Sequence, residues 1–142
     1  MGESHARDAE KWILVVDGGD QDASLIARAL RKQQRVEVVR HAANGDEALG
    51  LLTSGPRLIF MESHLRGMPA MELLDRIRRH PMAAHVPVVF LSDDVRPQSV
   101  VQALHGGANA YVAKALEYDQ MTANLANTLT FWLDTHQSPY LI

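Results

Sequence analysis

The fold is decided by the stretch Leu58-Ile59-Phe60-Met61-Glu62-Ser63-His64-Leu65-Arg66-Gly67-Met68-Pro69, in which a short apolar run passes directly into a polar loop. Glycine and proline lie on both sides of the run Leu58 to Met61, as is typical of an interior parallel strand buried on both faces. In open α/β sheets, the residue just beyond the carboxyl end of such a strand lies in the ligand crevice, and here that residue is Glu62. Because burying a charge costs several kcal/mol unless it is paired, Glu62 is predicted to belong to a site.

Length and composition indicate one ordinary soluble domain. The 142 residues are enough to bury a sizeable core, and 46% of them are hydrophobic and 22% charged. The net charge of −3 lacks the basic footprint of a nucleic-acid-binding protein, and the lack of cysteine excludes disulfides and thiolate metal sites. No apolar run approaches the ~20 residues of a membrane span, and the polar start does not resemble a secretory signal. We therefore expect a cytoplasmic protein that binds neither nucleic acid nor membranes.

Strands and helices are predicted to alternate along the chain. Short apolar runs predict strands at 12–16, 36–39, 58–61, 87–91 and 110–113, and the helical spacing of apolar residues predicts a helix after each of them. This alternation, with its short connections, predicts an α/β fold: a doubly wound parallel sheet of five strands with helices on both faces. We expect one domain over residues 12–135, preceded by a flexible lead-in at 1–11 and followed by a tail at 136–142.

Polar side chains follow the predicted strands at the points where the strands end. Asp17 follows the first strand, Glu62 the third, Ser92 and Asp93 the fourth, and Lys114 the fifth. Since the carboxyl ends of parallel strands lie at one edge of a sheet, carboxylates, a hydroxyl and an amine should converge there. These groups suit phosphoryl chemistry, in which carboxylates hold a divalent cation while a hydroxyl and an ammonium contact the phosphoryl oxygens.

Five segments carry a recognisable pattern in their order and spacing: Ile13-Leu14-Val15-Val16-Asp17, Ala43-Asn44-Gly45-Asp46-Glu47-Ala48-Leu49, Leu65-Arg66-Gly67-Met68, Val86-Pro87-Val88-Val89-Phe90-Leu91-Ser92 and Gly107-Ala108-Asn109-Ala110-Tyr111-Val112-Ala113-Lys114. Together they resemble the receiver domain of two-component response regulators, over nearly the whole chain from Trp12 onward. The resemblance implies a flavodoxin-like sheet of strand order 2-1-3-4-5. It also implies that Ser92, Tyr111 and Lys114 are the residues that contact a phosphoryl group or change position with it.

The sequence departs from this family pattern where the chemistry takes place. Glu62 stands where the family has the aspartate that accepts a phosphoryl group from a histidine kinase. Gly18 stands where the first strand normally ends in a second acid that helps to bind Mg²⁺, and Ala115 replaces a proline after the lysine. The Glu62 carboxylate is one methylene further out, and misplacement by an ångström can cost a transfer step about 10²-fold.

These departures favour a stand-alone receiver-like signalling module that works through protein contacts, independently of phosphorylation, and is not an enzyme. One alternative is a working phosphoacceptor that takes phosphate from a histidine kinase with Mg²⁺. A weaker alternative is a small-molecule-binding flavodoxin-like module that uses the same crevice, where Gly18-Gly19 leaves extra room.

Within the site, Glu62 is expected to pair with Lys114, which would give the lysine the negative partner that a phosphoaspartate supplies and lower the pKa of Glu62. No cofactor is expected; the ligands of any Mg²⁺ would be Asp17, Glu62 and the backbone of His64. The His64 side chain is expected to be an ordinary loop residue, and Ser63 to point away from Glu62 because side chains alternate along a strand. Asp22 is expected to cap the first helix.

The C-terminal part of the chain predicts a protein–protein contact. Phe131, Trp132 and Leu133 are consecutive large apolar residues that cover more than one side of a helix, and Tyr140-Leu141-Ile142 adds another apolar patch. A similar Phe-Trp-Leu sequence follows the last helix of receivers that work beside phytochrome-type kinases and pair through that region. We expect a homodimer through this helix. We expect no output domain after this helix, and we therefore expect a signalling partner such as a histidine kinase.

Overall fold

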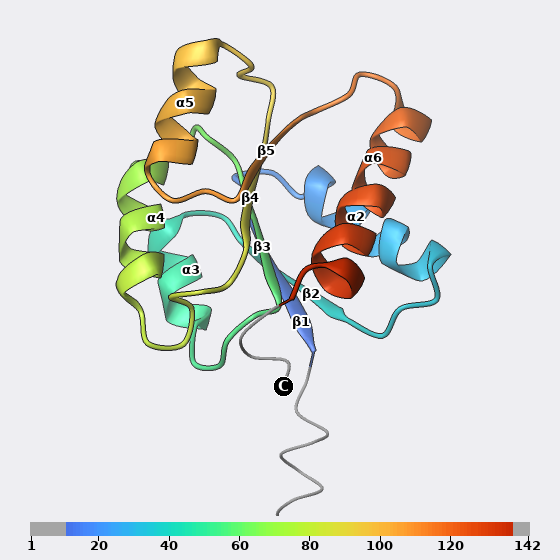
Figure 1. Ribbon diagram of the computed structural model, residues 1–142, viewed down its shortest axis with the longest axis horizontal. Coiled ribbons are helices and arrows are strands. Elements are labelled where there is room, and N and C mark those ends of the chain that lie inside the picture. Colours follow the sequence, from blue (N-terminus) through green and yellow to red (C-terminus); the bar gives the residue numbers. More distant parts are fainter. Residues whose placement is uncertain (1–10, 138–142) are drawn as a thin grey trace, which may run out of the picture.

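Five strands pair into one parallel sheet in the computed structural model, which describes residues 11–137 (Figure 1). The strands are β1 (Trp12–Val16), β2 (Val38–Ala42), β3 (Leu58–Met61), β4 (Val88–Ser92) and β5 (Ala110–Ala113). Their order is β2-β1-β3-β4-β5 and every neighbouring pair is parallel, which confirms the predicted topology. Every residue of β1, β3 and β4 is buried, as expected for interior strands that are covered on both faces.

Helices cover both faces of this sheet, as predicted (Figure 1). α2 (Gln21–Lys32) and α6 (Tyr118–Thr130) lie side by side on one face, while α3 (Gly45–Leu51), α4 (Ala70–Arg79) and α5 (Pro97–His105) lie on the other. Each face has its own hydrophobic core, because alternate residues of each strand point to opposite faces. The buried stripe of α2 follows the helical spacing read from the sequence: Leu25, Ile26, Ala29 and Leu30.

The second strand begins later than the apolar pattern predicted. It pairs with β1 from Trp12↔Val38 to Val16↔Ala42, whereas Val36 is 78% exposed. The chain leaves α2 through Gln34, which has a left-handed φ of 56°. Glu37 then accepts a hydrogen bond from Arg57 Nη1 at 2.7 Å, and its side chain is only 3% exposed. The segment between α2 and β2 therefore does not extend the strand, and the buried ion pair between Glu37 and Arg57 anchors it.

The last helix, α6, ends in a π-helical turn, η1 (Phe131–Thr135). The His136 N–H donates to the Phe131 carbonyl at 2.7 Å, which is the wider spacing of a π-turn. Leu133 is 5% exposed and belongs to the core beside α2 and α6, while Trp132 is partly buried and Phe131 is 48% exposed.

Two of the predicted features lie outside residues 11–137. The lead-in up to residue 10 and the apolar patch Tyr140-Leu141-Ile142 lie outside the described residues. Within residues 11–137, no helix has both the length and the apolar character that crossing a membrane requires.

Candidate functional site

The backbone of the sheet positions the polar residues that follow its strands. The N–H of Asp17 donates to the Ala42 carbonyl at 3.0 Å and that of Glu62 to the Val16 carbonyl at 2.9 Å. On the other side of the sheet, the Lys114 N–H donates to the Ser92 carbonyl at 3.0 Å. Each residue therefore continues the parallel hydrogen-bond ladder by one step, and the side chains are held at the carboxyl edge as the sequence predicted.

Lys114 lies at the centre of this edge, within contact distance of three carboxylates. Its Nζ is 2.6 Å from Glu62 Oε2, 2.8 Å from Asp22 Oδ2 and 3.3 Å from Asp17 Oδ2. The lysine side chain is 19% exposed and the three acidic side chains are 12–15% exposed, so the group is largely shielded from water. The expected contact between Glu62 and Lys114 is present, and Asp22 joins it.

Asp22 is a site residue that the sequence reading assigned to a different role. It was expected to cap α2, but Asp20 occupies the N-cap position and Asp22 is the second residue of the helix. Asp22 precedes Leu25 and Ile26 by one helical turn, so it continues the buried stripe of α2. An acidic residue on the buried stripe, in the first turn after a strand end, is the signal that could have placed it in the site.

Ser63 was predicted to point away from Glu62, and this prediction was wrong. Glu62 Oε1 accepts hydrogen bonds from the Ser63 N–H at 2.7 Å and from the Ser63 hydroxyl at 3.1 Å. The same hydroxyl lies 2.6 Å from the hydroxyl of Ser92, which is completely buried. Alternation of side chains ends with β3 at Met61, so the loop is free to turn Ser63 back toward the sheet edge.

The close packing of these groups shifts their pKa values. Burial raises the pKa of Asp22 to about 6, and its hydrogen bond with Asp17 acts in the same direction. Burial also opposes ionisation of Asp17, but hydrogen bonds with Asp22 and the Gly19 N–H, together with Lys114, bring its pKa below the ordinary value. For Glu62, hydrogen bonds from Lys114, Ser92 and Ser63 outweigh burial and lower the pKa, as predicted.

The pKa of Lys114 is raised by its acidic neighbours even though burial alone would lower it. The ammonium therefore stays charged throughout the physiological range. Above about pH 6, where Asp22 is ionised, the three carboxylates around it leave the cluster with excess negative charge.

The resemblance noted above implies that the site binds Mg²⁺, so the question is whether these residues can hold a divalent cation. Asp17, Asp22 and Glu62 each offer a carboxylate oxygen within 4.8 Å of the others, and oxygen donors suit Mg²⁺. However, the ammonium of Lys114 already lies between these oxygens, at 2.6–3.3 Å from each. The site in this arrangement does not fit the metal. Gly18 leaves room for a further side chain, because an added Cβ would meet only the Ala43 carbonyl oxygen, at 4.0 Å.

A chain of hydrogen bonds leads from Glu62 to the loop between β4 and α5. The Asp94 N–H donates to Ser92 Oγ at 3.0 Å, and the Tyr111 hydroxyl donates to the Asp94 carbonyl. The Tyr111 ring stacks on Phe90, with centroids 5.7 Å apart and planes at 19°. Tyr111 is thus held inward by both its ring and its hydroxyl, and the expected site residue Ser92 connects it to the carboxylates.

The side chain of Asp94, rather than that of the exposed Asp93, organises this loop. Its carboxylate accepts hydrogen bonds from Arg96 at 2.8 and 2.9 Å and from the Ser99 hydroxyl at 2.8 Å, and it lies 3.0 Å from His64 Nε2. The Arg96 and Ser99 bonds hold the pKa of Asp94 well below its usual range. His64 is a loop residue, as expected, and links the loop after β3 to the loop after β4.

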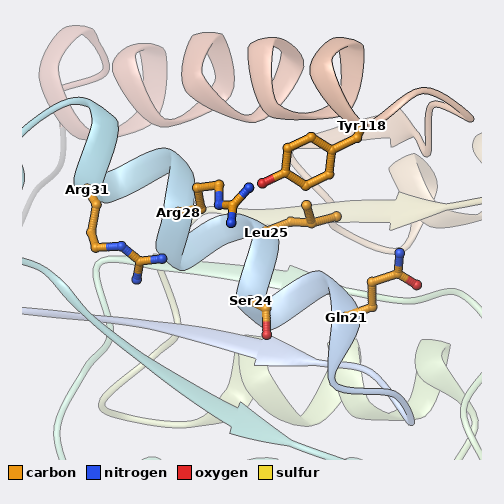
Figure 2. Close-up of a pocket in the computed structure, with 6 residues that line it drawn as sticks. All are labelled: Gln21, Ser24, Leu25, Arg28, Arg31 and Tyr118. Carbon is orange, nitrogen blue, oxygen red and sulfur yellow. The ribbon is translucent and has the colours of Figure 1, made fainter.

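A hollow of about 240 Å³ lies apart from this cluster, between α2 and the start of α6 (Figure 2). Gln21, Ser24, Leu25, Arg28, Arg31 and Tyr118 line it. Figure 2 shows that Arg28 extends toward Tyr118, and its guanidinium carbon lies 5.0 Å from the centre of the ring. The hollow is smaller than the ~300–1,000 Å³ of most small-molecule sites and is not lined by Gly18, so it is not the crevice considered as an alternative ligand site.

The chain is similar in sequence to a known protein family and to several known proteins. The family model described as the response regulator receiver domain matches residues 13–126. The "Probable methanogenesis regulatory protein FilR2" of Methanothrix harundinacea is 25% identical over 134 residues, which cover 89% of this chain and 86% of that protein. The two-component response regulator ORR6 of Oryza sativa subsp. japonica is 31% identical over 108 residues, which cover 75% of this chain and 64% of ORR6.

A solved structure is also similar to this chain, in fold and in sequence. The crystal structure of the phosphorylated cyanobacterial phytochrome response regulator RcpA matches with a TM-score of 0.84 at 27% identity, and the match covers 92% of this chain and 99% of that one.

Proposed function

This chain belongs to the response regulator receiver family, and we propose that it is a signalling module that acts through protein contacts without being phosphorylated. The observation that carries the proposal is the bonding of Glu62, which stands at the phosphoacceptor position. One carboxylate oxygen is 2.6 Å from the Lys114 ammonium, and the other accepts two hydrogen bonds from Ser63. Hydrogen bonding and ion pairing of both oxygens draw charge from the carboxylate and fix its orientation, which makes it a poorer nucleophile, because attack on phosphorus needs a correctly placed lone pair.

The surroundings of Glu62 support the same conclusion. In-line phosphoryl transfer depends on positioning and on neutralising the charge that develops on the transferred group. Glu62 is one methylene longer than aspartate, Gly18 supplies no acid, and the ammonium of Lys114 occupies the space among the remaining carboxylates. Repairing one of these features should therefore not restore the reaction.

We propose that the chain contacts its signalling partners through exposed apolar surfaces. Val95, Val101 and Leu104, on α5 and the loop before it, are 56%, 50% and 44% exposed, which suits contact with a signalling protein such as a histidine kinase. The second surface is the aromatic cluster of Phe131, Trp132 and His136, whose ring centroids lie 4.8–6.4 Å apart.

We propose that the aromatic cluster pairs two copies of the chain. Phe131 is 48% exposed and Trp132 partly so, but Leu133, which was also expected in the interface, is buried in the chain's own core. Phe131 and Trp132 are therefore the residues that would meet a second copy.

Incubation with acetyl phosphate and Mg²⁺, followed by intact-mass measurement, tests the proposal. We expect no added phosphoryl mass on the unmodified protein and little on Glu62→Asp. The double variant Glu62→Asp, Gly18→Asp should be labelled, because it restores the acceptor and the second acid and because position 18 has space for the new side chain. Efficient Mg²⁺-dependent labelling of the unmodified protein at Glu62 would overturn the proposal in favour of a working phosphoacceptor.

A further inference from the structure

We infer that Lys114 is the resident cation of this site: its ammonium takes the place that a divalent metal ion would occupy, and Asp22 supplies the acid that Gly18 lacks. The inference deepens the proposed function, on which it rests, by naming what fills the site. It concerns occupancy of the carboxylate cluster and not phosphorylation, so the two can be tested separately.

The number of acidic contacts supports this role. A lysine ammonium has three N–H donors and no acceptor, and three carboxylates from three different elements of the chain surround Lys114 Nζ. Asp17 comes from the end of β1, Glu62 from the end of β3 and Asp22 from the first turn of α2. A simple surface ion pair would need one of these acids. Three acids around one partly buried ammonium resemble the ligand set of a cation.

Asp22 is the member of the set that an ordinary structural role does not explain. It does not cap its helix, since Asp20 holds that position. Its Oδ2 is buried and accepts no hydrogen bond of good geometry from the described part of the chain, although Lys114 Nζ is 2.8 Å away. An oxygen that is held in place mainly by charge is one that a cation of a different kind could take over.

A tethered ammonium has a clear advantage over a metal ion from solution. The lysine is part of the chain, so its charge is present at every metal concentration, whereas Mg²⁺ must shed water before it binds. Displacing Lys114 would also break contacts with all three acids at once. The unmodified protein should therefore bind divalent cations weakly. If the ammonium is removed, the same carboxylates lose their counter-charge and become a site for a divalent cation.

Titration with Mn²⁺, followed by the electron paramagnetic resonance signal of the unbound ion, tests this inference in the absence of any phosphodonor. Lys114→Met keeps an unbranched, flexible side chain, one atom shorter than lysine, and removes its charge; this variant should bind one Mn²⁺ roughly tenfold or more tightly than the unmodified protein. The double variant Lys114→Met, Asp22→Asn should lose this gain. Lys32→Met, which removes an exposed lysine at the end of α2, is the matched control and should not change binding.

Circular dichroism of the same samples covers the case in which Lys114→Met does not fold alone. Mn²⁺ should then restore its helical signal, because a ligand that binds the folded state stabilises it, and should not restore that of the double variant. The inference is overturned if the unmodified protein binds Mn²⁺ as tightly as Lys114→Met. It is also overturned if Lys114→Met gains neither binding nor folding with Mn²⁺, or if Asp22→Asn leaves the gain intact.

Discussion

Replacing Asp22 with asparagine should stabilise the protein at neutral pH, although it removes a contact with Lys114. The pKa of Asp22 is raised from 3.8 to about 6 in the folded state, so the folded protein holds this proton more tightly than the unfolded chain. Stability falls with pH wherever the folded state binds more protons, so Asp22 lowers the free energy of unfolding as the pH rises from about 4 to about 6. Below this range the effect is absent, and above it the effect is complete.

The size of the effect follows from the pKa difference. At 1.36 kcal/mol for each pKa unit, a rise from 3.8 to about 6 corresponds to about 3 kcal/mol. The side chain is 12% exposed, and the water that reaches it lowers the expected gain of Asp22→Asn at neutral pH to about 2 kcal/mol. The pKa values of Asp17 and Glu62 are lowered, so these residues change the stability mainly below their ordinary pKa values of 3.8 and 4.5. They therefore do not account for a change in stability near pH 6.

Urea denaturation followed by circular dichroism, at several pH values from about 4 to about 8, measures this difference. The stability curves of Asp22→Asn and the unmodified protein should meet near the acid end and diverge as the pH rises through about 6. Asp119→Asn, in the first turn of α6 and exposed, is the matched control and should show no such divergence. A difference between Asp22→Asn and the unmodified protein that is constant with pH, or a less stable Asp22→Asn at pH 8, would refute the reasoning.

Two further predictions concern the rest of the chain. Trp132→Ala should shift a dimer toward monomer in sedimentation at micromolar concentration, whereas Leu133→Ala, at a core position, should lower the free energy of unfolding by about 2–4 kcal/mol; a monomeric unmodified protein would contradict the dimer. Arg78→Ala should cost about 2–3 kcal/mol in urea denaturation, because Arg78 donates to the Gly107 and Val86 carbonyls. The exposed Arg79, paired with Asp75 one turn earlier, is its control and should cost about 0.5 kcal/mol or less.

Much of the fold was predictable because it depends on patterns that are local in the sequence. Fully apolar runs such as Leu58 to Met61 identify interior strands, and their alternation with helices leaves few possible topologies. The same logic brought Asp17, Glu62, Ser92 and Lys114 to one edge, because each directly follows or ends a strand. These residues could be placed without knowing any side-chain conformation.

The features that sequence reasoning missed depend on how the chain continues after a regular element ends. Ser63 turns toward Glu62 because the strand geometry stops at Met61, and Asp22 faces the site because α2 begins earlier than a cap at that residue would allow. Leu133, expected in the interface, is buried because it lies four residues after Leu129 and so continues the buried stripe of α6. For Ser63 and Asp22, a shift of one or two residues in an element boundary decides where the side chain points, and such boundaries are weakly encoded in sequence.

The most direct test of phosphorylation independence is the response of the unmodified protein to beryllofluoride, a phosphoryl analogue, in the presence of Mg²⁺. In ¹H–¹⁵N correlation spectra, the amide signals of Ser92, Tyr111 and Lys114 report on the site and on the loop that Tyr111 contacts. We predict that these signals do not move, because Glu62 and the carboxylates around it are already bonded to Lys114 and Ser63. Saturable shifts of these signals that require both Mg²⁺ and beryllofluoride would contradict this account.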